Sequence, residues 1–360
     1  MSTLQISLAV VGGLVLAGVV AHSAWSSRRN LPKRATPEAV PPAETAVAAQ
    51  IPKAEPEGEA ERLEPSFDAD SGLASLNSLT RLTTPERKPG LDVLIDAVAA
   101  IALDNVVSGE AALAAMPSTR RAGSKPFGVE GLSVITGEWE FPTAGHRYSA
   151  FQCGVQLANR TGALNQIEYS EFVMKAQAFA DAVGGEPEFP EMLDEVARAR
   201  ELDQFASAHD AQLNFTLRAV NTAWSPGYVQ QSAARLGFVP GSIPGRMVLP
   251  ATQPGNAPIL GLAFDTQAAM ADDPEQTALR ELTLSLDVPQ VSRSEQPFAR
   301  MCEAALALAA NMDGVIIDDN GNLIRPEAME VIHADLEQLY DTLDSRDLSA
   351  GSVLGRRLFS

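Results

Sequence analysis

Residues that could bind metals or act as catalysts are few and widely spaced in this chain of 360 residues. The two cysteines, Cys153 and Cys302, match neither a zinc motif nor a disulfide framework, and they fit a reducing compartment. The sequence has no Walker loop and no G-x-S-x-G nucleophile elbow. None of the four histidines has the spacing of a metal ligand pair: His22, His146, His209 and His333. We therefore expect a protein that is not an enzyme and that uses no cofactor or metal.

The most site-like cluster is the acidic run Asp318-Asp319-Asn320-Gly321-Asn322. A calcium loop needs oxygen ligands at fixed positions over twelve residues, and this run lacks that spacing. An Asn-Gly pair between two apolar stretches is instead typical of a β-hairpin turn. The run therefore predicts a turn.

The segment Leu4–Ala24 contains no charged residue and is just long enough to cross a bilayer, which needs roughly 20 apolar residues. A cleaved signal peptide is the alternative, but such peptides carry positive charge before the apolar core, and Met1–Gln5 has none. The basic residues follow the core instead: Arg28, Arg29, Lys33 and Arg34. By the positive-inside rule, residues 1–25 predict a single-pass membrane anchor through residues 4–24, with the N-terminus outside and the folded part in the cytoplasm.

The formal net charge of −19 argues against a nucleic-acid partner. Residues 26–89 begin with the basic cluster and continue as a stretch rich in Pro, Ala and Glu, with few aromatic residues. Such a composition buries too little apolar surface to fold, so it predicts a disordered linker.

The globular part is expected from residue 90 to about 345, with strand and helix signals in alternation. Gln212–Val220 alternates apolar and polar residues as a half-buried strand does, and Gln296–Asp313 has the pattern of a helix. The similar segments Ala178–Gly185 and Ala307–Gly314 indicate a degenerate duplication, although convergent helix composition could also produce them. The predicted fold is α+β: an antiparallel sheet with helices on one face (split β-α-β), in two tandem copies at 90–208 and 211–345, followed by a flexible tail at 346–360.

The combination of these parts resembles the ZipA family of bacterial cell-division proteins. The resemblance rests on His22-x-x-Trp25-x-Ser27-Arg28-Arg29 after the apolar segment, on Leu282–Pro289, and on Met312–Leu339. It covers residues 4–34 and 212–343 and does not account for 90–205. It implies a non-enzymatic tether that links FtsZ filaments to the inner membrane, with the C-terminal peptide of FtsZ bound on the open face of the sheet.

Strand alternation sorts the C-terminal residues into two faces. The helix-facing set is uniformly apolar: Leu213, Phe215, Leu217, Met247, Leu249, Leu260, Leu262, Phe264, Leu282, Leu284 and Leu286. The partner-binding candidates on the open face are Thr216, Arg218, Arg246, Val248, Ala263, Asp265, Thr283, Ser285 and Asp287.

This second set departs from the apolar groove of the family, because most of its members are polar. Two arginines in it could pair with peptide carboxylates, and Val248 and Ala263 could form a small apolar floor. A merely solvated face or a one-residue error in register are the alternatives. The competing function is a membrane-anchored scaffold or sensor that binds another protein or a small ligand in a deep pocket between the two copies.

Overall fold

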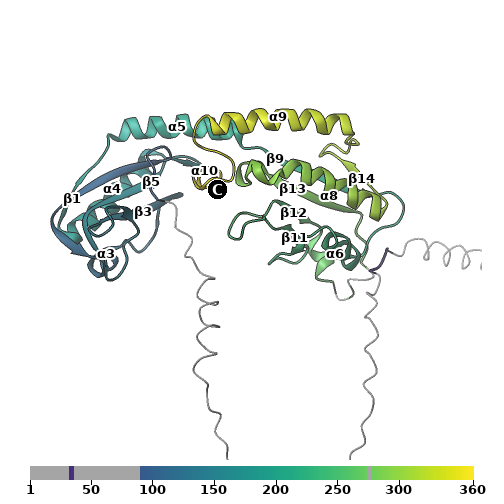
Figure 1. The fold of residues 1–360 in the computed structure, drawn as a ribbon, viewed down its shortest axis with the longest axis horizontal. Helices are drawn as coiled ribbons and strands as arrows, with labels where there is room; N and C mark the ends of the chain where they lie inside the picture. The colour runs from purple at the N-terminus through teal and green to yellow at the C-terminus, as the bar shows by residue number, and fades with distance from the viewer. Residues whose placement is uncertain (1–31, 36–89, 272, 274–276) are drawn as a thin grey trace, which may run out of the picture. The chain divides into compact units, whose positions relative to one another are not determined.

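The computed structural model describes residues 32–35, 90–271, 273 and 277–360 (Figure 1). The predicted membrane anchor and most of the predicted linker lie outside these residues. Within the described part of the chain, no helix is both long enough and apolar enough to cross a membrane.

The first lobe, residues 90–209, is a sheet in the order β2-β3-β5-β1-β8, with β4 paired to β3 and with every pairing antiparallel. Its core packs alternate side chains of the sheet, such as Phe127, Phe151 and Val155, against Phe172 and Phe179 of α4. The elements are β1 (Asp96–Ser108), α3 (Gly109–Ala115), β2 (Arg121–Ala122), β3 (Lys125–Ser133), β4 (Trp139–Glu140), β5 (Arg147–Gln156), β6 (Ala158–Asn159), β7 (Gly162–Ala163), α4 (Gln166–Val183), β8 (Gly185–Glu188) and α5 (Met192–His209).

The second lobe, residues 212–345, is an antiparallel sheet in the order β10-β11-β12-β13-β9-β14. Helices α6 and α8 contribute Val229, Met301, Ala305 and Leu308 to its core. The elements are β9 (Gln212–Ala219), α6 (Pro226–Ala234), β10 (Val239–Pro240), β11 (Arg246–Leu249), β12 (Leu260–Ala263), α7 (Thr266–Ala269), β13 (Glu281–Asp287), α8 (Pro297–Met312), β14 (Gly314–Ile317) and α9 (Pro326–Asp344). The protein is thus of mixed α+β class, as predicted.

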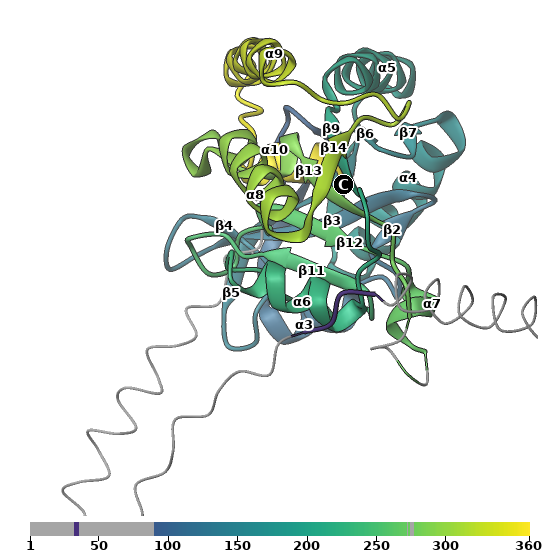
Figure 2. The ribbon, with the colours of Figure 1, turned by 90° about the vertical axis from the view of Figure 1, so that its right-hand side faces the viewer.

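The two lobes share an order of elements. The first strand of each, β1 or β9, lies between the strand that precedes the main helix and the strand that follows it. The main helices α4 and α8 both end at a residue in the left-handed conformation, Gly184 and Asp313. Each lobe then closes with a long helix, α5 or α9, and Figure 2 shows both of these helices nearly end-on.

Helix α5 connects the two hydrophobic cores. Its Ala199 packs in the core of the first lobe, whereas Phe205 and Ala206 pack in the core of the second. The predicted boundary between two copies, at residues 208–211, therefore lies at the end of α5, and this helix packs in the cores of both lobes.

The predicted flexible tail at 346–360 is wrong, because this segment is part of the folded body. It forms the short helix α10 (Val353–Leu358), and Leu348, Leu358 and Phe359 are at most 1% exposed. The apolar side chains of the tail fill the boundary between the lobes, where they join the same core as Ile95 and Ala158 of the first lobe. That burial offsets the entropy of ordering the segment.

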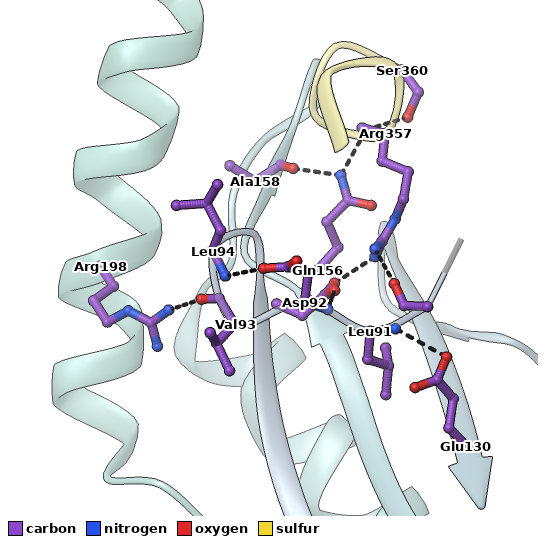
Figure 3. A network of polar contacts seen from close by, with 12 residues as sticks. Leu91, Asp92, Val93, Leu94, Glu130, Gln156, Ala158, Arg198, Arg357 and Ser360 are labelled. Atoms are coloured by element: carbon purple, nitrogen blue, oxygen red, sulfur yellow. Dashed lines mark hydrogen bonds and ion pairs between the residues drawn. The ribbon is translucent and has the colours of Figure 1, made fainter. Parts of the chain in front are cut away.

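Polar contacts fix the tail to both lobes, and Figure 3 shows those with the first lobe. From the first lobe, Gln156 Nε2 donates to the carbonyl of Arg357 at 2.8 Å. The guanidinium of Arg357 in turn lies 2.6 Å from the fully buried carboxylate of Asp96. From the second lobe, Gln290 Nε2 donates to the carbonyl of Phe359 at 2.8 Å.

Part of the predicted disordered linker is also ordered. Pro32–Ala35 lie beside the second lobe near α6, where Lys33 forms a parallel β-bridge with Trp224 (Figures 1 and 2). The backbone amide of Lys33 donates to Ala223 O at 2.7 Å, and the amide of Ser225 donates to Lys33 O at 2.8 Å. Two β-type hydrogen bonds and a buried Pro32 hold the segment in place.

Candidate peptide-binding face

The predicted assignment of the two faces of the second sheet is confirmed. Nine of the eleven residues expected to face the helices are buried, and the other two, Leu213 and Leu249, are half-buried and pack against the same core. The opposite side chains are half-buried or exposed. The sheet therefore has one covered face and one open face, in the register that alternation predicted.

Six of the nine candidate residues lie together on the open face. Cross-strand pairing places Arg246, Ala263, Thr283 and Thr216 in one row across four strands. Side chains directly opposite each other in neighbouring strands are about 5 Å apart, so the row is continuous. A second row holds Val248, Gly261 and Ser285. A Cβ at Gly261 would lie 2.6 Å from Ser285 Oγ, so the Ser285 hydroxyl occupies the space beside this glycine.

The remaining three candidates already have partners within the chain. Arg218 Nε lies 2.6 Å from the carboxylate of Glu281, its neighbour across the strands. Asp265 lies beyond the end of β12 and caps α7 by accepting a hydrogen bond from the amide of Gln267.

Asp287, the third candidate with a partner within the chain, pairs with Arg160 of the first lobe at 2.7 Å. Arg160 also binds Asp210, and these two carboxylates raise the pKa of its guanidinium above the ordinary value. The carboxylates of Asp265 and Asp287 thus already have partners within the chain. Both residues follow the alternation of their strands, but local capping and contact between the lobes engage their carboxylates.

An apolar margin along β14 belongs to the open face and was absent from the predicted set. Ile317 lies opposite Thr216, and Val315 lies opposite Arg218. Leu323 forms an antiparallel bridge with Ile317 and is 62% exposed. The alternation in Val315-Ile316-Ile317 was the signal that could have revealed these residues, because Ile316 alone packs into the core. Ile317 is only 3% exposed, so the accessible apolar side chains at the two sides of the polar centre are the half-buried Val248 on one side and Leu323 with the half-buried Val315 on the other.

The acidic run after β14 is a turn, as predicted. The carboxylate of Asp318 accepts hydrogen bonds from the amides of Asn320 and Asn322, and Gly321 adopts a positive φ of 83°. The hydrogen bond from the Asn322 amide is the main cause that lowers the pKa of Asp318. The turn positions Leu323 beside Ile317, and in this way it brings Leu323 into the apolar margin.

A cavity of about 430 Å³ lies where the two lobes meet. It is lined by Asn159–Gly162, by Asp203 and Ser207 of α5, and by Phe359 of the tail, among others. Arg160, Thr161 and Ser207 are exposed, so the cavity opens to solvent. Beside it, the ammonium of the buried Lys125 donates to Asn159 Oδ1 at 2.7 Å and to Gly162 O at 2.6 Å, and burial lowers its pKa.

Comparison with known proteins finds one family model that matches part of the second lobe. Residues 267–335 match the family model described as the ZipA, C-terminal FtsZ-binding domain. The match includes β13, α8, β14 and the first half of α9, together with the whole apolar margin. A search of curated proteins found no match. The chain is therefore similar to this family over residues 267–335, within the second lobe.

Proposed function

We propose that this protein is a tether of the bacterial division machinery. In this proposal the open face of the second sheet binds the C-terminal tail of FtsZ, and residues 4–24 anchor the chain in the inner membrane with the folded part in the cytoplasm. The observation that carries the proposal is the match of residues 267–335 to an FtsZ-binding domain family. The anchor is supported by the apolar composition of Leu4–Ala24 and by the basic residues that follow it.

The face offers chemistry for an extended peptide with both apolar and acidic side chains. Leu323 and the half-buried Val315 and Val248 can bury apolar groups, and Arg246 is exposed and available to a carboxylate. The Thr and Ser hydroxyls between them can bond to peptide backbone. No reacting group is required for this role, and the family named in the match is defined by binding.

Charge substitutions on the face test the site. Val248→Asp, Ala263→Glu and Leu323→Asp place a carboxylate where the proposal needs apolar contact. We expect each to weaken binding of a dye-labelled FtsZ C-terminal peptide about tenfold or more, which corresponds to about 1.4 kcal/mol. Fluorescence anisotropy with the full chain in nanodiscs measures the affinity.

The matched control is Val331→Asp on α9, which is also 62% exposed but lies away from the sheet face. It should bind the peptide like the unmodified chain. If all three face variants bind normally while remaining folded, the open face is not the binding site.

The duplication is a second part of the proposal. We infer that the two lobes are tandem copies, because β1-α3-β3-β5-α4-β8 and β9-α6-β12-β13-α8-β14 have the same order along the chain and the same central strand. Superposition of the two sets of Cα atoms tests this inference. A different crossing direction of α4 and α8 over their sheets would rule it out.

The cavity between the lobes supports the alternative role, a scaffold or sensor that binds a ligand there. Its polar lining and its opening to solvent suit a polar ligand rather than an apolar peptide. The variant Ser207→Trp would fill it. Loss of FtsZ binding in this variant, with normal binding in the three face variants, would favour the cavity over the face.

A further inference from the structure

The segment Pro32–Ala35 contacts the second lobe at the C-terminal end of helix α8, where a positive charge is stabilising. Helix α8 ends at Met312, and the last carbonyls of a helix have no partner within it. The ammonium of Lys33 donates to Met312 O at 2.9 Å, and the indole Nε1 of Trp224 donates to the same oxygen at 2.7 Å. The hydroxyl of Tyr228 covers the preceding carbonyl, that of Asn311, at 3.0 Å.

A cation suits this position because the C-terminal end of a helix carries a partial negative charge. Lys33 therefore makes two kinds of contact with the lobe, one through its ammonium and one through its backbone. The backbone contact extends an existing ladder, since Trp224 pairs with Lys33 on one side and with Leu279 on the other. Trp224 is fully buried, so the ladder rests on the core of the lobe.

We propose that Pro32–Ala35 are a docking strap that holds the second lobe next to the membrane. This consequence rests on the proposed anchor at residues 4–24. Seven residue steps separate Trp25 from Pro32, and an extended chain spans at most about 3.6 Å per residue, so the strap lies within roughly 25 Å of the end of the anchor.

The strap also changes the role expected of residues 36–89. Ala35 and Gly90 both belong to one folded unit. In this proposal, the length of residues 36–89 therefore does not set the distance between the lobe and the membrane. The residues that do set it are 26–31.

Hydrogen exchange on the full chain in nanodiscs tests the strap itself. The amides of Lys33 and Ser225 should exchange slowly, and Lys33→Glu should bring both to the rate of an unprotected peptide while β9 and β13 stay protected. The same result is expected of Lys33→Met, which keeps the length of the side chain without its charge. The control Arg34→Glu makes an equal charge change at an exposed residue and should leave the protection intact.

An unprotected Lys33 amide in the unmodified chain would overturn the strap. Full protection in both Lys33 variants would overturn the role of the ammonium. Neither result depends on membrane insertion or on FtsZ, so the strap can fail while the proposed function stands.

Energy transfer from a dye on Val331→Cys, in a Cys302→Ala background, to labelled lipids tests the consequence for membrane distance. Twelve Gly/Ser residues inserted between Arg29 and Asn30 should lower the transfer efficiency. The same insertion between Ala60 and Glu61 should leave it unchanged. Lower transfer from the second insertion alone would show that residues 36–89 act as the spacer. A chain that does not stay with the bilayer at all would contradict the proposed anchor and not the strap.

Discussion

At the residue scale, the arrangement of charges depends on contacts that pair residues far apart in the chain. Asp96 and Arg357 are the clearest case, because the carboxylate is fully buried and its partner comes from the last residues. Burial raises the pKa of Asp96, and the nearby guanidinium opposes that rise. The pair joins the tail to the first lobe, where Arg357 also donates to Gly90 O at 3.0 Å.

Arg357→Ala should lower the free energy of unfolding by about 3–5 kcal/mol at pH 8, because it leaves a buried carboxylate without its partner. Without Arg357, the pKa of Asp96 in the folded state rises further above its value in the unfolded chain. The folded state then binds the proton more tightly, so stability falls as pH rises between these two pKa values.

The loss caused by Arg357→Ala should therefore be smaller at pH 5 than at pH 8. Urea unfolding at both pH values measures it. Arg356→Ala, in the same helix, is the control and should cost less than about 1 kcal/mol. An equal loss of unfolding free energy at the two pH values would show that the unpaired carboxylate of Asp96 is not what destabilises the variant.

At the scale of elements, strand alternation predicted the faces of the second sheet because one of them packs on a core. The same pattern does not reveal the partners of Asp265 and Asp287, which are a helix turn and the first lobe. Pro32–Ala35 carry no periodic signal, and their order comes from Trp224 and the end of α8. The order of the tail is hidden from the sequence for a related reason: Leu348, Leu358 and Phe359 are too few to form a periodic pattern, and the boundary between the lobes is where they pack.

The tail helix α10 offers a test of that packing. Phe359 is 1% exposed, and Phe359→Ala should cost about 3–5 kcal/mol of unfolding free energy by creating a cavity at the boundary. Val353→Ala removes a side chain that is 40% exposed in the same segment and should cost less than about 1 kcal/mol. Equal values from denaturant titrations of the two variants would contradict the packing of the tail between the lobes.

At the scale of the whole molecule, the two lobes, the tail and the strap form one folded unit with an open sheet face. A single peptide contact on a largely polar face is expected to be weak. A filament that presents many tails to many membrane-held copies gains affinity from multivalency. Under the proposed anchor and strap, these copies share a common distance from the bilayer, which favours simultaneous contact with one filament.

The most direct test of the tether is co-sedimentation of the full chain, held in nanodiscs, with FtsZ polymers. The account predicts that the chain pellets with polymers of intact FtsZ and stays in the supernatant when FtsZ lacks its C-terminal tail. Equal pelleting with both forms of FtsZ, or no pelleting with either, would contradict it.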